Sequence, residues 1–116
     1  MKKITFLLIF TILSSTYMVA QTSIEGVWNT GKDNTKINIA EENSIWTGKT
    51  LSSDNEKVIA GKVMLKDLEK KGKIWQGKLF FPKKKAWYNV KIKANEEQLE
   101  LTIKVGFMSK TIFWER

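Results

Sequence analysis

The side chains that could support acid–base chemistry in this sequence are pairs of carboxylates. They stand at Glu41 and Glu42, at Asp54 and Glu56, and at Glu96 and Glu97. Two carboxylates can act as general acid and general base only where burial or charged neighbours move their acidities apart. Each pair here lies beside Asn or Ser in a polar stretch, where a solvated turn is expected. We therefore interpret these carboxylates as turn residues.

Histidine and cysteine are both absent from the sequence. The commonest general base near neutral pH and the commonest transition-metal ligand are therefore missing. Disulfides, thiol catalysis and thiolate metal sites are excluded as well. The sequence also contains no recognisable nucleophile elbow or phosphate loop. It predicts a protein that is not an enzyme, with no catalytic residues, no metal site and no cofactor.

Residues 80–93, FFPKKKAWYNVKIK, interleave aromatics with lysines, as do sheets that stack nucleic-acid bases. Apolar side chains alternate from Ala86 through Tyr88 and Val90, and this period of two places the intervening lysines on the opposite face of a strand. Because the aromatics do not share a face, we predict no nucleic-acid partner. The alternation puts Trp87 on the outer face, near the lysines of the preceding turn.

An exposed tryptophan beside lysines is a reasonable contact for a partner. The candidate exterior contact residues are Lys83, Lys84, Lys85 and Trp87. The alternative is that the ring of Trp87 lies under a neighbouring lysine stem or a loop.

The same alternation divides the chain after residue 23 into eight short strands separated by turn-like residues. They are expected at residues 26–29, 36–41, 45–50, 62–68, 73–81, 86–94, 99–105 and 110–116. The only proline, Pro82, belongs in a turn because it cannot donate to a strand ladder. The fold class is all-β, an antiparallel up-and-down barrel, with a flattened β-sandwich as the alternative. Residues 61–71 are also compatible with one or two helical turns.

The N-terminus has the three-part pattern of a secretory signal peptide. Two lysines precede an apolar run over residues 4–13, and small or polar residues lead to Ala20. Ten apolar residues would span about half of a ~30 Å hydrocarbon layer as a helix. We therefore predict a signal peptide over residues 1–20, cleavage after Ala20, an extracytoplasmic (periplasmic or secreted) location and no stable transmembrane anchor after processing. A retained N-terminal anchor is the alternative.

The predicted mature region, residues 21–116, has the length of a single domain. Removing Lys2 and Lys3 from the 20 basic residues leaves 18 against 12 acidic ones, a net charge of +6. Such a surface favours attraction to anionic partners without identifying one.

The two ends of this region carry a pair of matching features. Gly26 and Trp28 form a G-x-W, and Trp114 and Arg116 end the chain. This resembles the calycin (lipocalin and fatty-acid-binding) barrels, in which an arginine of the last strand covers a tryptophan of the first. The resemblance implies a barrel-closing set, and a guanidinium over an indole ring contributes about 0.5–2 kcal/mol.

The order of motifs is similar to that of a secreted bacterial family, domain of unknown function 2147. The motifs are Gly26 and Trp28, then Gly48 with Lys49, Gly61 with a leucine-rich piece, Trp75-x-Gly77-Lys78 with Pro82 and Tyr88, and a tail of Gly106, Thr111, Trp114 and Arg116. The chain departs from the family at Ser109 and Lys110, where Gly-Arg is usual, and in a shorter middle loop. The resemblance implies a lipocalin-like barrel and an extracytoplasmic address, and it brings no activity.

Five tryptophans are many for so short a chain, and they favour an interior mostly filled by side chains. Trp46, Trp75 and Tyr88 are the candidates for lining a ligand cavity. The function that we expect is binding of a small apolar or amphipathic ligand in the barrel. The alternative is an envelope-associated interaction module that uses the Trp87-bearing exterior. The partner is then a small ligand or an envelope component, and the oligomeric state is left open.

Overall fold

The structure is a computed structural model that describes residues 23–116 and consists of β-strands and their connections. The signal peptide predicted for residues 1–20 lies outside the described residues. The strands are β1 (Gly26–Asn29), β2 (Lys36–Glu42), β3 (Ile45–Ser52), β4 (Val63–Lys71), β5 (Ile74–Phe81), β6 (Ala86–Ala94), β7 (Gln98–Val105) and β8 (Met108–Glu115). Each predicted strand is present, with bounds that differ by three residues or fewer. No helix among these residues is long and apolar enough to cross a membrane.

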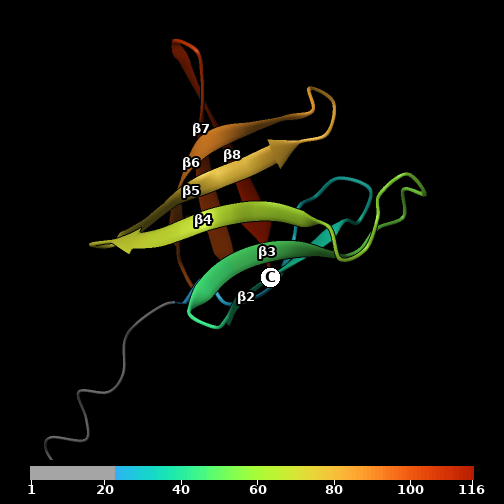
Figure 1. Cartoon of the computed structure of the whole chain (residues 1–116), viewed down its shortest axis with the longest axis horizontal. Coiled ribbons are helices and arrows are strands. Elements are labelled where there is room, and N and C mark those ends of the chain that lie inside the picture. The colour runs from blue at the N-terminus through green and yellow to red at the C-terminus, as the bar shows by residue number, and fades with distance from the viewer. Residues whose placement is uncertain (1–22) are drawn as a thin grey trace, which may run out of the picture.

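The strands form a closed antiparallel barrel in which each strand pairs with the next along the chain (Figure 1). Short connections between consecutive strands favour this up-and-down order. The β-sandwich alternative is therefore wrong. Closure depends on a narrow seam, because β1 pairs with β8 at one position only, Asn29 with Glu115.

The alternation of strand directions assigns every connection to one of two barrel ends. The β1–β2, β3–β4, β5–β6 and β7–β8 connections lie at one end, which we call the open-loop end. The β2–β3, β4–β5 and β6–β7 hairpins lie at the other end, together with residues 23–25 and the C-terminus, and we call this the plugged end. The open-loop end holds the long connection between β3 and β4.

Strand β4 contains the main irregularity of the barrel. Its register with β5 shifts between Lys66 and Glu69, and Asp67 adopts a positive φ of 54°. This bulge is why its sequence also suggested helical turns, an alternative that the structure does not adopt. The bulge turns Leu68 inward, where it packs over Gly77 of β5; a Cβ atom at Gly77 would lie 2.7 Å from Leu68 Cδ2 and 2.7 Å from the Lys66 carbonyl oxygen.

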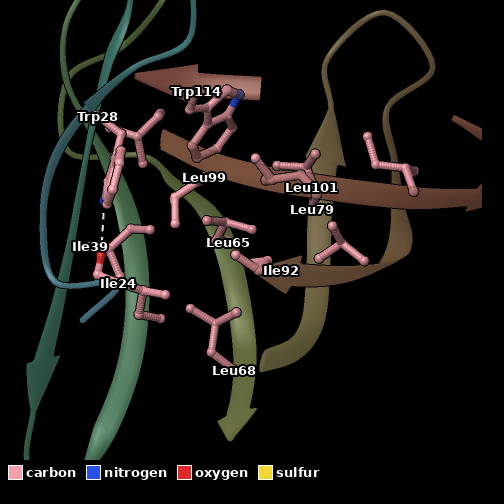
Figure 2. Close-up of a cluster of buried hydrophobic side chains, with 13 residues drawn as sticks. Ile24, Trp28, Ile39, Leu65, Leu68, Leu79, Ile92, Leu99, Leu101 and Trp114 are labelled. Carbon is pink, nitrogen blue, oxygen red and sulfur yellow. Dashed lines mark hydrogen bonds between the residues drawn. The ribbon is translucent and has the colours of Figure 1, made fainter. Parts of the chain in front are cut away.

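Thirteen hydrophobic side chains fill the barrel, each exposed by 7% or less (Figure 2). They are Ile24, Trp28, Ile37, Ile39, Leu65, Leu68, Leu79, Val90, Ile92, Leu99, Leu101, Ile103 and Trp114. Every strand except β3 contributes at least one of them, and β3 brings Gly48 instead, whose Cβ position is closed by Leu65 and Ile37. The inward alternation predicted for β6 and β7 is confirmed by this set.

Candidate functional site

The plugged end is closed by the two chain termini. The guanidinium of Arg116, the only arginine in the sequence, lies 4.1 Å from the centre of the Trp28 ring. Trp28 is fully buried, and its indole Nε1–H donates to the Ile24 carbonyl at 2.8 Å; Figure 2 draws this bond as a dashed line. This is the contact between first and last strands that the sequence predicted.

Hydrogen bonds hold Arg116 in this position. Its guanidinium donates to the carbonyl oxygens of Ser23, Glu25 and Glu96 at 2.9, 3.1 and 3.1 Å. Gly26 leaves room for it, because a Cβ atom there would lie 2.7 Å from Arg116 Nη1. Trp114 is buried opposite Leu99 in the β7–β8 ladder. The four residues of the G-x-W and tail motifs therefore build a structural plug.

The three candidate cavity residues are half-buried and pack against the core. Trp46 and Trp75 meet edge to face with ring centres 5.1 Å apart. Tyr88 meets Phe81 at the same separation, in a tilted pair. Trp46 and Trp75 lie toward the plugged end of β3 and β5, whereas Tyr88 and Phe81 lie toward the open-loop end. The structure thus separates the three into two aromatic pairs, one near each end of the core.

Trp87 lies on the outer surface, as the alternation predicted, but its ring is half-buried. It pairs across the strands with Phe80, with ring centres 5.2 Å apart. Lys66 Nζ stands 4.1 Å from the centre of the Trp87 ring, and Lys62 Nζ stands 4.3 Å from that of Phe80. The alternative in which a neighbouring lysine covers Trp87 is therefore the arrangement found. We call Phe80 and Trp87, together with the two lysines that cover them, the capped aromatic pair.

The lysines of the β5–β6 connection are exposed. Lys83, Lys84 and Lys85 follow Pro82 in a turn closed by backbone bonds from Lys84 to Phe81 and from Lys85 to Pro82. Lys85 has a positive φ of 49° and belongs to this turn. The turn places three cations at the open-loop end, beyond the capped aromatic pair.

A groove of about 630 Å³ crosses the outer surface from β4 to β8. Cross-strand partners line its centre: Lys78 faces Asn89, and Lys91 lies between Gln76 and Thr102. The polar residues that line its central strands are Gln76, Lys78, Asn89, Lys91, Thr102 and Lys104. Lys78 and Asn89 are two residues along their strands from Phe80 and Trp87, so the capped aromatic pair lies next to the groove on the same face of the sheet.

The carboxylate pairs are exposed and lie apart from this groove. Asp54, Glu56, Glu96 and Glu97 occupy connections, whereas Glu41 and Glu42 end strand β2, so the turn predicted from residue 42 begins one residue later, at Asn43. Within residues 23–116, no three carboxylates come together as a metal site.

Sequence reasoning missed the groove, and it did not identify which lysine covers Trp87. The outward positions of β5 and β6 could be read from their alternation, but which residues face one another depends on the register between strands. The register places Lys66 beside Lys78, across from the β6 residues that line the groove.

The fold and this surface define a small closed eight-stranded barrel with a filled interior and a polar outer groove. A family model described as "Uncharacterized protein conserved in bacteria (DUF2147)" matches residues 26–116, and the chain belongs to this family. The match begins at Gly26 and ends at Arg116, the two residues in contact at the plug. Comparisons with curated proteins and with solved structures gave no match.

Proposed function

We propose that the protein is a non-enzymatic binding module that works outside the cytoplasm and binds an anionic component of the cell envelope on its exterior. The observation that carries this proposal is where the free volume lies. The interior is packed with side chains exposed by 7% or less, whereas the groove of about 630 Å³ lies on the outer surface.

The groove has the chemistry of a site for an anionic polymer. Four lysines line it against two carboxylates, a lining charge of +2, and the carboxylates lie at its β4 edge, where Lys71 pairs with Glu69. Lys78, Lys91 and Lys104 provide the positive charge away from that edge, while the amides of Gln76 and Asn89 offer both donors and acceptors. The adjoining rings of Phe80 and Trp87 provide apolar area at one end. A phosphate- or carboxylate-bearing chain could lie along the groove and contact the rings after displacing the lysine caps.

The extracytoplasmic address is supported by the signal-peptide pattern of residues 1–20 and by membership of a bacterial family. The net charge of +6 over residues 21–116, the predicted mature region, suits a partner of negative charge, because long-range attraction raises the rate of encounter.

A second candidate is the binding of a small apolar or amphipathic ligand at a barrel mouth. The half-buried aromatic pairs, Trp46 with Trp75 and Phe81 with Tyr88, favour it, since rings at the ends of a core offer apolar surface to a ligand. In this reading the mouth of a lipocalin-like barrel, rather than its packed interior, would hold the ligand.

The test is a titration of residues 21–116 with polyphosphate and, separately, with a fatty acid, followed by tryptophan fluorescence. We expect polyphosphate to change the emission in a manner that weakens with salt, because the contacts are ionic. The variant Lys78→Glu/Lys91→Glu should lower the affinity about tenfold or more.

The matched control is Lys32→Glu/Lys57→Glu, which changes the net charge equally in loops outside the groove, and it should retain most of the affinity. Equal losses in both variants would reduce the interaction to net charge and contradict a groove site. A response to the fatty acid alone, insensitive to salt, would favour the second candidate.

A further inference from the structure

The distal half of the β7–β8 hairpin extends beyond the barrel wall. β7 and β8 pair with each other from Gln98 with Glu115 up to Val105 with Met108. The pairing of β7 with β6 stops at Ile103, and β8 meets β1 only at Glu115. Residues 104–109 therefore form a two-stranded arm with no strand paired to it on either side, and within it Val105 still packs against the core. In Figure 1 this orange-to-red hairpin projects above the other strands.

The tip of the arm exposes two large apolar side chains. Gly106, with φ of 63°, opens a two-residue turn, the position that glycine takes in tight hairpin turns. Phe107 is 108% exposed and Met108 is 74% exposed, the two highest values among the exposed large hydrophobic residues. Single exposed apolar residues are ordinary. Two adjacent ones at the end of a projecting arm form an exposed apolar patch, which is typical of a site that binds another molecule or a membrane.

Two lysines flank this apolar tip. Lys104 and Lys110 flank it and are exposed, and residues 102–113 contain no aspartate or glutamate. The same barrel end carries the β5–β6 turn with Lys83, Lys84 and Lys85. An apolar tip flanked by lysines is complementary to a layer whose interior is apolar and whose surface is anionic.

We propose that the β7–β8 tip docks the protein on an anionic lipid bilayer. Phe107 and Met108 enter the boundary between headgroups and acyl chains, while Lys104 and Lys110 contact lipid phosphates. The β7–β8 ladder pairs the backbone of the arm internally, so only the turn itself meets the interface. This surface goes beyond the proposed groove function: it shares Lys104 and Ser109 with the groove lining, but its apolar residues are different.

A second copy of the chain fits the tip less well than a bilayer. A buried phenylalanine contributes roughly 200 Å², whereas a stable protein interface takes about 800 Å² from each partner. Phe107 and Met108 together fall well short of that area. A bilayer requires no shaped partner surface, and its affinity grows with each inserted side chain and each nearby cation.

The experiment uses residues 21–116, which hold every strand and every core residue of the closed barrel. Because the sequence has no cysteine, Ser109→Cys can carry a single environment-sensitive fluorophore at the tip, and Glu96→Cys one at the plugged end. With vesicles of equal parts phosphatidylcholine and phosphatidylglycerol, we expect a blue shift at position 109 and none at 96. Vesicles of phosphatidylcholine alone should give a much smaller change.

In vesicle flotation of the unlabelled protein, Phe107→Ser/Met108→Ser should weaken binding about tenfold or more, since two apolar side chains no longer leave water. Ile45→Ser removes an apolar side chain that is 62% exposed at the opposite end, and it should bind like the parent. Retained polyphosphate binding by the tip variant would separate this surface from the groove.

Equal shifts at positions 109 and 96, or flotation unaffected by the tip variant, would overturn the proposal. A blue shift at position 109 that appears without vesicles and grows with protein concentration would assign the tip to a second copy of the chain, and it would overturn the bilayer as well.

Discussion

At the scale of single residues, Arg116 joins more parts of the chain than any other side chain described above. It contacts the buried Trp28 ring and donates to carbonyls of residues 23–25 and of the β6–β7 turn. Lysine could supply the charge, but its single ammonium group lacks the planar fork that meets several carbonyls while stacking on a ring. Gly26 has its place in the motif because any larger residue would occupy the site of the guanidinium.

We therefore expect Arg116→Ala to lower the free energy of unfolding by about 1–3 kcal/mol, through loss of the ring contact and of hydrogen bonds to carbonyls. Arg116→Lys should recover only part of this loss. Urea denaturation monitored by tryptophan fluorescence measures the difference, and Lys83→Ala in the exposed β5–β6 turn is the control expected to stay within about 0.5 kcal/mol. A midpoint equal to that of the parent would contradict a stabilising plug.

At the scale of the strands, the bulge in β4 and Gly77 in β5 form one structural unit. The extra residue turns Leu68 into the barrel. The Leu68 side chain occupies the space that a side chain at residue 77 would otherwise fill, and Gly77 leaves that space open. This explains why the W-x-G-K motif places glycine between an aromatic residue and an outward lysine: Trp75 and Gly77 share the inner face, and Lys78 lines the groove.

Gly77→Ala should destabilise the protein by about 1–3 kcal/mol, because the new methyl group would overlap both Leu68 and the Lys66 backbone carbonyl. Adding Leu68→Ala to this variant relieves only the side-chain overlap, so the double variant should remain less stable than the parent. Thermal unfolding measures both effects. If Gly77→Ala unfolds at the parental temperature, the bulge does not pack as described.

At the scale of the whole molecule, the barrel is closed unevenly. β5 through β8 are linked by ladders of five to eight paired residues, whereas β1 has four residues and a single pair with β8. Much of the closure at this seam therefore falls to the plug formed by Arg116 and Trp28. Local opening is expected where backbone pairing is shortest.

Amide hydrogen exchange should accordingly be at least about tenfold faster in β1 than in the centre of β6. Arg116→Ala should accelerate exchange in β1 more than that of Ile92, because Ile92 lies within the ladders on both sides of β6 and its exchange rises only through the loss of global stability. Mass spectrometry of peptic fragments resolves the two strands. Equal protection of β1 and β6 would show that the seam is as firmly closed as the rest of the wall.

The strand pattern and the turns could be predicted from the residues alone, whereas the partnership of Trp28 with Arg116 was implied by the resemblance to calycin barrels. Apolar alternation along residues 86–94 and 99–105 is a local property of the chain, and Pro82 or the Asn95 to Glu97 stretch ends a strand whatever surrounds it. The same alternation predicts that Trp87 lies on the outer face.

Only the tertiary structure decided what covers Trp87, where the groove lies and how far the β7–β8 arm extends. Lys66 reaches the Trp87 ring because of the register between β4, β5 and β6, which includes a bulge in β4 that the sequence left indistinguishable from a helical turn. The arm exists because the pairing of β7 with β6 stops at Ile103, and because β1 is short and pairs with β8 at one position only. These features depend on pairings between distant segments, and local side-chain periodicity carries no information about where such pairings end.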